Sequence, residues 1–137
     1  MNNPIVKAIL AAIAGVLTAG IVVGVVEAIG HMIFPPPEGL DISNPEDAAR
    51  IMQVIPLGAK IAVVVAWLTG ALAGSLVAGW IARSTKPGWV VAAFMVLASG
   101  VTTMMFPHPI WMIIAAVVLP IVAKLAADRM IALRLNP

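Results

Sequence analysis

Four long apolar stretches, separated by short polar or proline-containing segments, restrict this chain to a membrane-embedded helical fold. A spanning helix needs about 20 mainly apolar residues, because each residue rises about 1.5 Å and the hydrocarbon core is about 30 Å thick. The chain has 137 residues, of which 62% are hydrophobic and 10% charged, whereas soluble domains are about 45–50% apolar and about 25% charged. We therefore expect an all-α integral membrane four-helix bundle, with residues 1–137 forming a single transmembrane domain.

The predicted spans cover residues 4–34, 57–82, 89–106 and 110–131. Pro4 suits the first turn of a helix, and Pro35–Pro37 end the first span because proline has no amide donor. The loop 35–56 is the longest hydrophilic stretch, and it contains Asn44 followed by Pro45, which together are typical of a helix start. We expect a short interfacial helix in this loop, from Pro45 to about Ile55.

The lysines and arginines predict the orientation in the membrane. In a four-span arrangement six of the eight share one end, and they are Lys7, Arg83, Lys86, Lys124, Arg129 and Arg134, leaving Arg50 and Lys60 at the other. Because basic residues are enriched on the cytoplasmic side, both termini are expected in the cytoplasm and the loop 35–56 outside. We expect a multi-pass protein of a bacterial inner membrane.

Small residues predict which helix faces pack together. Steps of 100° per residue place Gly20 and Gly24 on the same face of the first span as Glu27 and His31. The second span repeats small residues every four positions, at Ala66, Gly70, Gly74 and Ala78. This pattern allows close backbone approach. We expect these two surfaces to be partners.

Glu27 and His31 form the candidate proton or ligand site. A carboxylate and an imidazole at positions i and i+4 meet on one helix face, and an ionisable residue within a span indicates a functional site by default. His108 lies in the short turn 107–109, which is expected at the same outer end. The sequence therefore predicts that Glu27, His31 and His108 gather near the outer surface.

These three residues leave four chemical interpretations open. Imidazole and carboxylate donors can bind a divalent metal such as Zn²⁺, and two histidines can ligate a haem. The Glu27 carboxylate can instead exchange a proton for a cationic solute. In the remaining interpretation, which we favour, Glu27 reaches interfacial water, His31 pairs with it, and no cofactor is bound.

The segment Val26-Glu27-Ala28-Ile29-Gly30 resembles the first helix of small multidrug-resistance exporters. That resemblance implies a role for Glu27 in exchanging protons for cationic drugs, and it covers Val26–Gly30 alone. The long acidic loop 35–56 is not part of that family's pattern. The chain as a whole resembles small bacterial four-span membrane proteins with a proline-rich first loop.

Several classes of function are disfavoured. The absence of cysteine removes thiolate metal sites and cysteine nucleophiles, and no catalytic motif is present, so we expect no enzyme. Nucleic-acid binding is not expected, because the basic residues lie near helix ends where they anchor the protein in the membrane. The expected function is that of an accessory or structural subunit, packing in the lipid bilayer as a homo-oligomer or within a larger membrane complex. Transport or metal binding through the Glu27 site is the alternative.

Overall fold

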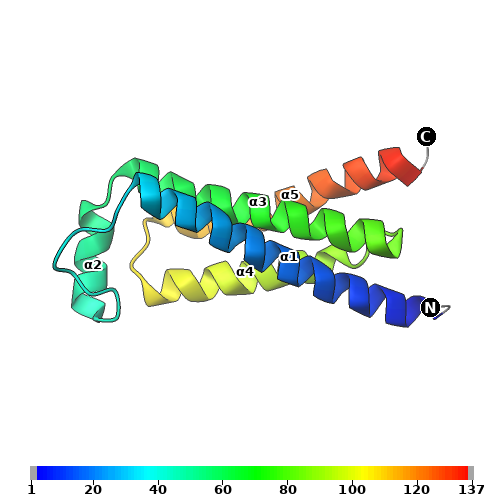
Figure 1. The fold of residues 1–137 in the computed structure, drawn as a ribbon, viewed down its shortest axis with the longest axis horizontal. Coiled ribbons are helices and arrows are strands. Elements are labelled where there is room, and N and C mark those ends of the chain that lie inside the picture. Colours follow the sequence, from blue (N-terminus) through cyan, green and yellow to red (C-terminus); the bar gives the residue numbers. More distant parts are fainter. Residues whose placement is uncertain (1–2, 136–137) are drawn as a thin grey trace.

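Five α-helices form the described part of the chain, residues 3–135, in this computed structural model (Figure 1). They are α1 (Pro4–Ile33), α2 (Pro45–Val54), α3 (Leu57–Ala82), α4 (Gly88–Met105) and α5 (Ile110–Leu135). All but α2 are long and apolar enough to cross a membrane. The predicted all-α fold with four spans, and a short helix between the first two, is confirmed.

The ends of the helices follow local chemistry. The Asn3 side chain accepts a hydrogen bond from the Ile5 amide at 2.9 Å, which caps α1. Observed and predicted boundaries differ by a residue or less except at the end of α5, which continues to Leu135 instead of stopping at 131. The last turns of α5 carry Lys124 and Asp128 four residues apart and Arg134 at the carboxyl end, and both arrangements favour continued helix.

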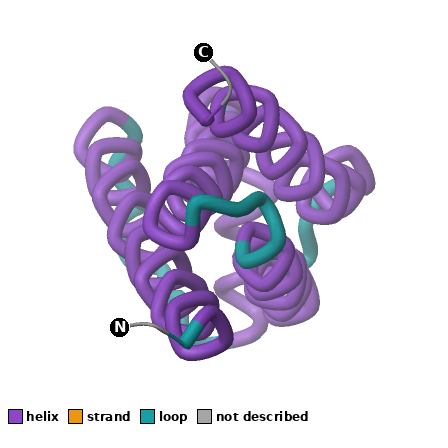
Figure 2. The backbone as a smooth tube through the Cα atoms, turned by 90° about the vertical axis from the view of Figure 1, so that its right-hand side faces the viewer, coloured by secondary structure: helices purple, strands orange, loops and turns teal. Residues whose placement is uncertain are grey.

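Helix α3 lies at the centre of the bundle. It packs against α1, α4 and α5, and α4 also contacts α1 and α5. Figure 2, viewed from the end that carries both termini, shows the spans side by side with the N- and C-terminal ends on opposite sides of the bundle. The core consists largely of small side chains, which permit close helix contacts, and its members are Ala19, Trp67, Ala71, Ala78, Val91, Met95, Met112, Ala116 and Ala123.

The predicted small-residue stripe of α3 is buried in the bundle and contacts α1. A Cβ atom placed on Gly74 would lie 2.5 Å from Gly15 O, and one on Gly70 would lie 2.9 Å from Ala19 O. Backbone oxygens cannot move aside cheaply, so both positions require glycine for α1 to approach this closely.

The predicted partner face of α1 is wrong. Gly20 and Gly24 are exposed, and no atom lies within 4 Å of a Cβ placed on either residue. Helix α1 instead presents Gly15 and Ala19, both buried, to α3. Because α1 carries apolar residues on all of its sides, no boundary between polar and apolar residues marks the side that faces its neighbour.

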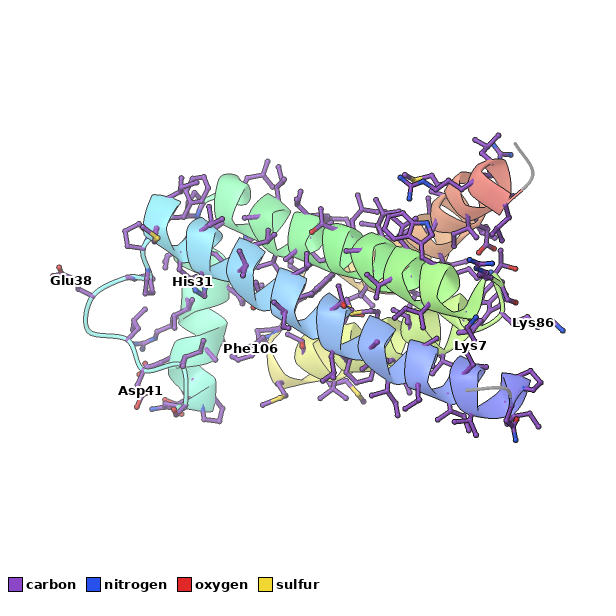
Figure 3. The ribbon with its side chains drawn as sticks, turned by 45° about the vertical axis from the view of Figure 1, so that its right-hand side comes forward. Lys7, His31, Glu38, Asp41, Lys86 and Phe106 are labelled. Atoms are coloured by element: carbon purple, nitrogen blue, oxygen red, sulfur yellow. The ribbon has the colours of Figure 1, made fainter. Side chains whose placement is uncertain are left out.

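The two ends of the bundle differ in charge. Lys7 and Lys86 lie at the end that carries the termini, whereas His31, Glu38 and Asp41 lie toward the opposite end (Figure 3). Helix α2 lies across this second end, at a steep angle to the spans (Figure 1). We call the first the basic end and the second the acidic end.

Candidate ligand-binding cavity at the acidic end

A cavity of about 550 Å³ lies at the acidic end, between the ends of the spans and α2. Its walls come from α1, the loop that follows it, α2, α3, α4 and the turn before α5. This volume lies within the range of about 300–1,000 Å³ that is typical of small-molecule sites. The cavity is therefore large enough for a ligand.

The last turns of α1 carry the predicted polar pair into this cavity. Glu27 is half-buried, His31 is exposed, and both line the cavity together with Phe34. Their spacing of four residues places them one above the other on the helix. Gly30, between them, is buried against Ala62 of α3, where a Cβ would lie 3.1 Å from the Ala62 Cβ. Close contact with α3 thus holds the polar pair at the wall.

His108 lines the same cavity from the turn between α4 and α5. Its Nδ1 lies 2.8 Å from Phe106 O, and because a carbonyl oxygen only accepts, Nδ1 donates the proton in this hydrogen bond. In the neutral ring this leaves Nε2 as an acceptor. The His108 ring also lies 6.1 Å from the buried Trp67 ring, measured between centroids. The structure therefore brings Glu27, His31 and His108 to one cavity.

Local hydrogen bonds order the loop that covers the cavity. The Ser43 amide donates to Asp41 Oδ1 at 2.8 Å, and the Asp41 amide donates to Asp47 Oδ2 at 3.2 Å. The Asn44 side chain accepts from the Glu46 amide at 3.0 Å, which caps α2. These contacts hold Asp41 at the edge of the cavity, which it lines.

Helix α2 covers the cavity with its apolar face. Ile51 and Met52 line the cavity, as does Ile55 directly after the helix, and Ala48 on the same helix is buried. Arg50, by contrast, is exposed and does not line it. The apolar face of α2 is therefore turned toward the cavity.

The cavity combines apolar walls with acidic groups. Phe34 and Phe106 supply aromatic surface, Glu27 and Asp41 supply carboxylates, and no lysine or arginine of residues 3–135 lines it. Carboxylates and aromatic faces both attract cations, and apolar walls favour a ligand with hydrocarbon surface. The arrangement suits a small cation that is partly apolar.

The geometry also bears on the metal-site alternative. Among residues 3–135, no three histidine, cysteine, aspartate or glutamate side chains form a cluster that could hold a metal ion. Glu27, His31 and His108 therefore share a cavity without forming a ligand set in this arrangement.

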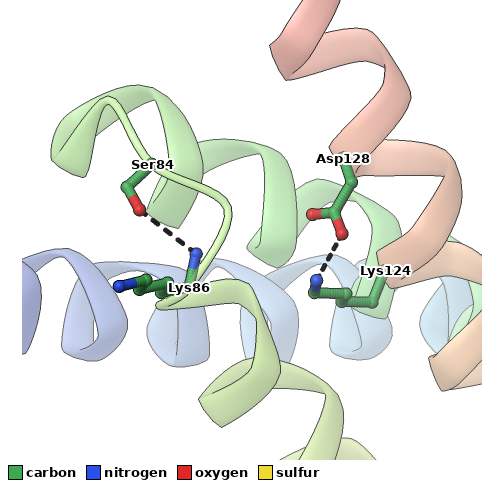
Figure 4. A network of polar contacts seen from close by, with 4 residues as sticks. All are labelled: Ser84, Lys86, Lys124 and Asp128. Carbon is green, nitrogen blue, oxygen red and sulfur yellow. Dashed lines mark hydrogen bonds and ion pairs between the residues drawn. The ribbon is translucent and has the colours of Figure 1, made fainter.

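A second polar group lies at the basic end, and its lysine was predicted to be a membrane anchor. The Lys124 ammonium pairs with the Asp128 carboxylate (Figure 4) and lies 4.1 Å from the centroid of the Trp89 ring. Lys124 is only 2% exposed. A Cβ on Gly88 would lie 3.6 Å from both Lys124 Cε and Ser75 Cβ, and the buried Ser75 hydroxyl has no hydrogen-bond partner among the described residues. The opposite charges at i and i+4 were the sequence signal for this pair.

The contribution of Asp41 to the cavity was not predicted. Asp41 stands in an acidic loop where any carboxylate could have faced solvent. Only the path of the loop brings it to the cavity. Trp67 does not line the cavity, and its ring lies beside that of His108.

Comparisons of the chain with protein-family models, with curated proteins and with solved structures found no match. Helix length and hydropathy identify it as a small multi-span membrane protein.

Proposed function

We propose that this membrane protein binds a small, partly apolar organic cation in the cavity at the acidic end, with Glu27 as its counter-ion. The observation that carries the proposal is that Glu27 is half-buried and lines a largely apolar cavity beside Phe34. A carboxylate in such a place interacts with a bound cation more strongly than one in water, because the local dielectric constant is lower.

The distribution of charge supports the same ligand. Five of the six acidic residues lie toward the acidic end, namely Glu27, Glu38, Asp41, Glu46 and Asp47. The two basic residues at this end, Arg50 and Lys60, do not line the cavity. Clustered charge of one sign raises the local concentration of oppositely charged solutes.

Transport is the extension of this proposal. The resemblance of Val26–Gly30 to small multidrug-resistance exporters implies that Glu27 exchanges a proton for the cation. In that mechanism the cation and the proton compete for one carboxylate, so proton binding releases the cation.

Binding of tetraphenylphosphonium to the purified full-length protein tests the proposal. Glu27→Gln, which keeps the shape and removes the charge, should weaken binding about tenfold or more, the loss expected for a partly desolvated ion pair. Glu38→Gln is the matched control, because Glu38 is exposed at the same end and does not line the cavity. Triphenylphosphine oxide, a neutral molecule of similar shape, should bind more weakly than the cation.

Two outcomes would count against this function. Equal affinity of wild type and Glu27→Gln for tetraphenylphosphonium would remove the counter-ion role, and equal affinity for the neutral analogue would remove the preference for cations. Uptake of the cation into proteoliposomes, driven by a pH gradient, tests transport separately. Binding without uptake would leave a binding protein and not a transporter.

The accessory-subunit function remains a second candidate, supported by the open face of α1. Gly20 and Gly24 have no neighbouring atoms where a side chain would begin, so another helix can approach the α1 backbone there. The Gly20→Leu/Gly24→Leu variant should reduce self-association or recovery of a native complex, measured by crosslinking in membranes. Gly100→Leu on α4, which also meets open space, is the control. Unchanged crosslinking in the double variant would remove this candidate.

A further inference from the structure

A groove of about 860 Å³ opens between α1 and the turn from α3 to α4 at the basic end. Ile9, Ile13 and Val16 of α1 form one wall, and Val90 of α4 stands opposite. Ser84 and the exposed Lys86 line it at the turn between α3 and α4, which we call its mouth. The groove is thus apolar along α1 and carries a cation at its mouth.

The shape of this groove follows from where α1 contacts the other spans. A Cβ on Gly15 would lie 2.6 Å from Gly74 O and 2.7 Å from Val91 Cγ2, so α1 meets both α3 and α4 at that point. On the amino-terminal side of this contact, the groove separates residues such as Ile5 and Ile9 of α1 from Val90. The close contact at Gly15 therefore marks where α1 and α4 converge.

The charge of the basic end selects the occupant. Six of the eight lysines and arginines lie there, and of the six acidic residues only Asp128 does. Asp128 is engaged by Lys124, and the Lys86 side chain points away from that pair (Figure 4). Among residues 3–135 no acidic side chain pairs with Lys86. The ammonium at the mouth is therefore available to an anion.

We propose that this groove binds one anionic phospholipid, with an acyl chain against the apolar walls and the phosphate at Lys86. Basic pockets between spanning helices bind anionic headgroups in this way. The proposal concerns the end opposite to the cation cavity, so it stands or falls independently of the proposed function.

Native mass spectrometry of the purified full-length protein tests the site. Dioleoyl phosphatidylglycerol should bind more tightly than dioleoyl phosphatidylcholine, whose acyl chains are the same. Lys86→Ala should weaken binding of the anionic lipid about fivefold, the contribution expected of one lysine near an anionic surface. Lys60→Ala, which removes a lysine at the acidic end, is the control and should change nothing.

A second variant tests the apolar part of the groove. Val90 is 53% exposed, so Val90→Trp adds bulk in the groove without disturbing the core. It should weaken binding of both lipids while leaving Lys86 in place. Circular dichroism and the melting temperature show whether each variant is folded.

Four results would overturn the proposal. Equal binding of the two lipids would mean that the protein does not recognise the headgroup charge. Unchanged binding by Lys86→Ala or by Val90→Trp would place the lipid elsewhere on the bundle. If water-soluble glycerol phosphate competed with an affinity equal to that of the anionic lipid, the acyl chain, and therefore the groove, would contribute nothing to binding.

Discussion

The Ser99 hydroxyl of α4 lies 2.9 Å from Ala116 O of α5, the carbonyl that would accept a helical hydrogen bond from residue 120. Residue 120 is proline, which has no amide proton, so this carbonyl has no donor within its own helix. Both Ser99 and Pro120 are buried, and a neighbouring helix therefore supplies the missing donor in place of water. The Ser99 proton is shared with Met95 O of its own helix, at 2.7 Å.

Ser99→Ala should destabilise the bundle by about 1 kcal/mol, because it leaves the buried Ala116 carbonyl without a partner. In a Pro120→Ala background, residue 120 regains an amide that can bond Ala116 O. The cost of Ser99→Ala should then fall toward zero. Unfolding in mixed micelles measures both differences, and an equal cost in the two backgrounds would disprove the link between Ser99 and Pro120.

Gly74→Ala should destabilise the protein by about 1–3 kcal/mol, the usual cost of overpacking a tight contact. Its new methyl group would lie 2.5 Å from Gly15 O and 2.9 Å from the Ala19 Cβ, so α1 and α3 must separate. Gly24→Ala is the matched control in the same kind of sequence motif. It meets open space, and the free energy of unfolding should change by about 0.5 kcal/mol or less. Equal destabilisation by the two substitutions would mean that Gly24 also lies in a helix interface.

Asp128→Asn should cost more than Lys124→Met. The first change leaves an ammonium that is 2% exposed without its counter-ion, and breaking a buried pair in this way costs about 3–5 kcal/mol. The second leaves a carboxylate that is 24% exposed and can reach water. The double variant should be more stable than the sum of the single losses predicts. The free energies of unfolding of the four proteins test this order, and the reverse order would mean that Asp128 is the less hydrated partner.

Asn44→Ala should loosen α2 while leaving the spans intact. Loss of the cap that Asn44 provides to the Glu46 amide costs about 1 kcal/mol, which corresponds to about fivefold faster hydrogen exchange if α2 opens locally. Gln53→Ala, an exposed change near the other end of α2, is the control. Mass-spectrometric exchange of a peptide covering 45–54 reports the effect. Faster exchange across α1 or α3 as well would show that α2 does not open as a local unit.

Single cysteines should report the predicted orientation. The chain has no cysteine, so Ser43→Cys in the loop before α2 and Thr85→Cys in the turn between α3 and α4 introduce unique thiols. A membrane-impermeant maleimide should label the first in intact cells and the second only after lysis, because the six basic residues favour a cytoplasmic basic end. The opposite labelling pattern would show that the protein has the inverted orientation in the membrane.

The predicted site shows which steps of the sequence argument hold and which do not. Glu27 and His31 lie on one wall because helical spacing alone requires it. His108 lies at the same end because two spans, α3 and α4, separate it from α1 and return the chain to that end. The loop residue Asp41 could not be placed in this way, since its position depends on how the loop folds over the bundle. The burial of Lys124 was missed for a similar reason. From sequence, a lysine near a helix end is interpreted as a membrane anchor, and only the structure shows whether a neighbouring helix buries it.

By itself the sequence determined the number of spans, their boundaries except the end of α5, and the separation of charge between the two ends. These features depend on helix length against bilayer thickness and on prolines that act on their own backbone. Only the tertiary structure decided that Gly15 and not Gly20 meets α3, that Ser99 serves the carbonyl freed by Pro120, and that α2 covers a cavity. In a helix that is apolar on every side, polarity does not mark the buried face. The fit of particular backbones, such as Gly15 against Gly74, decides it.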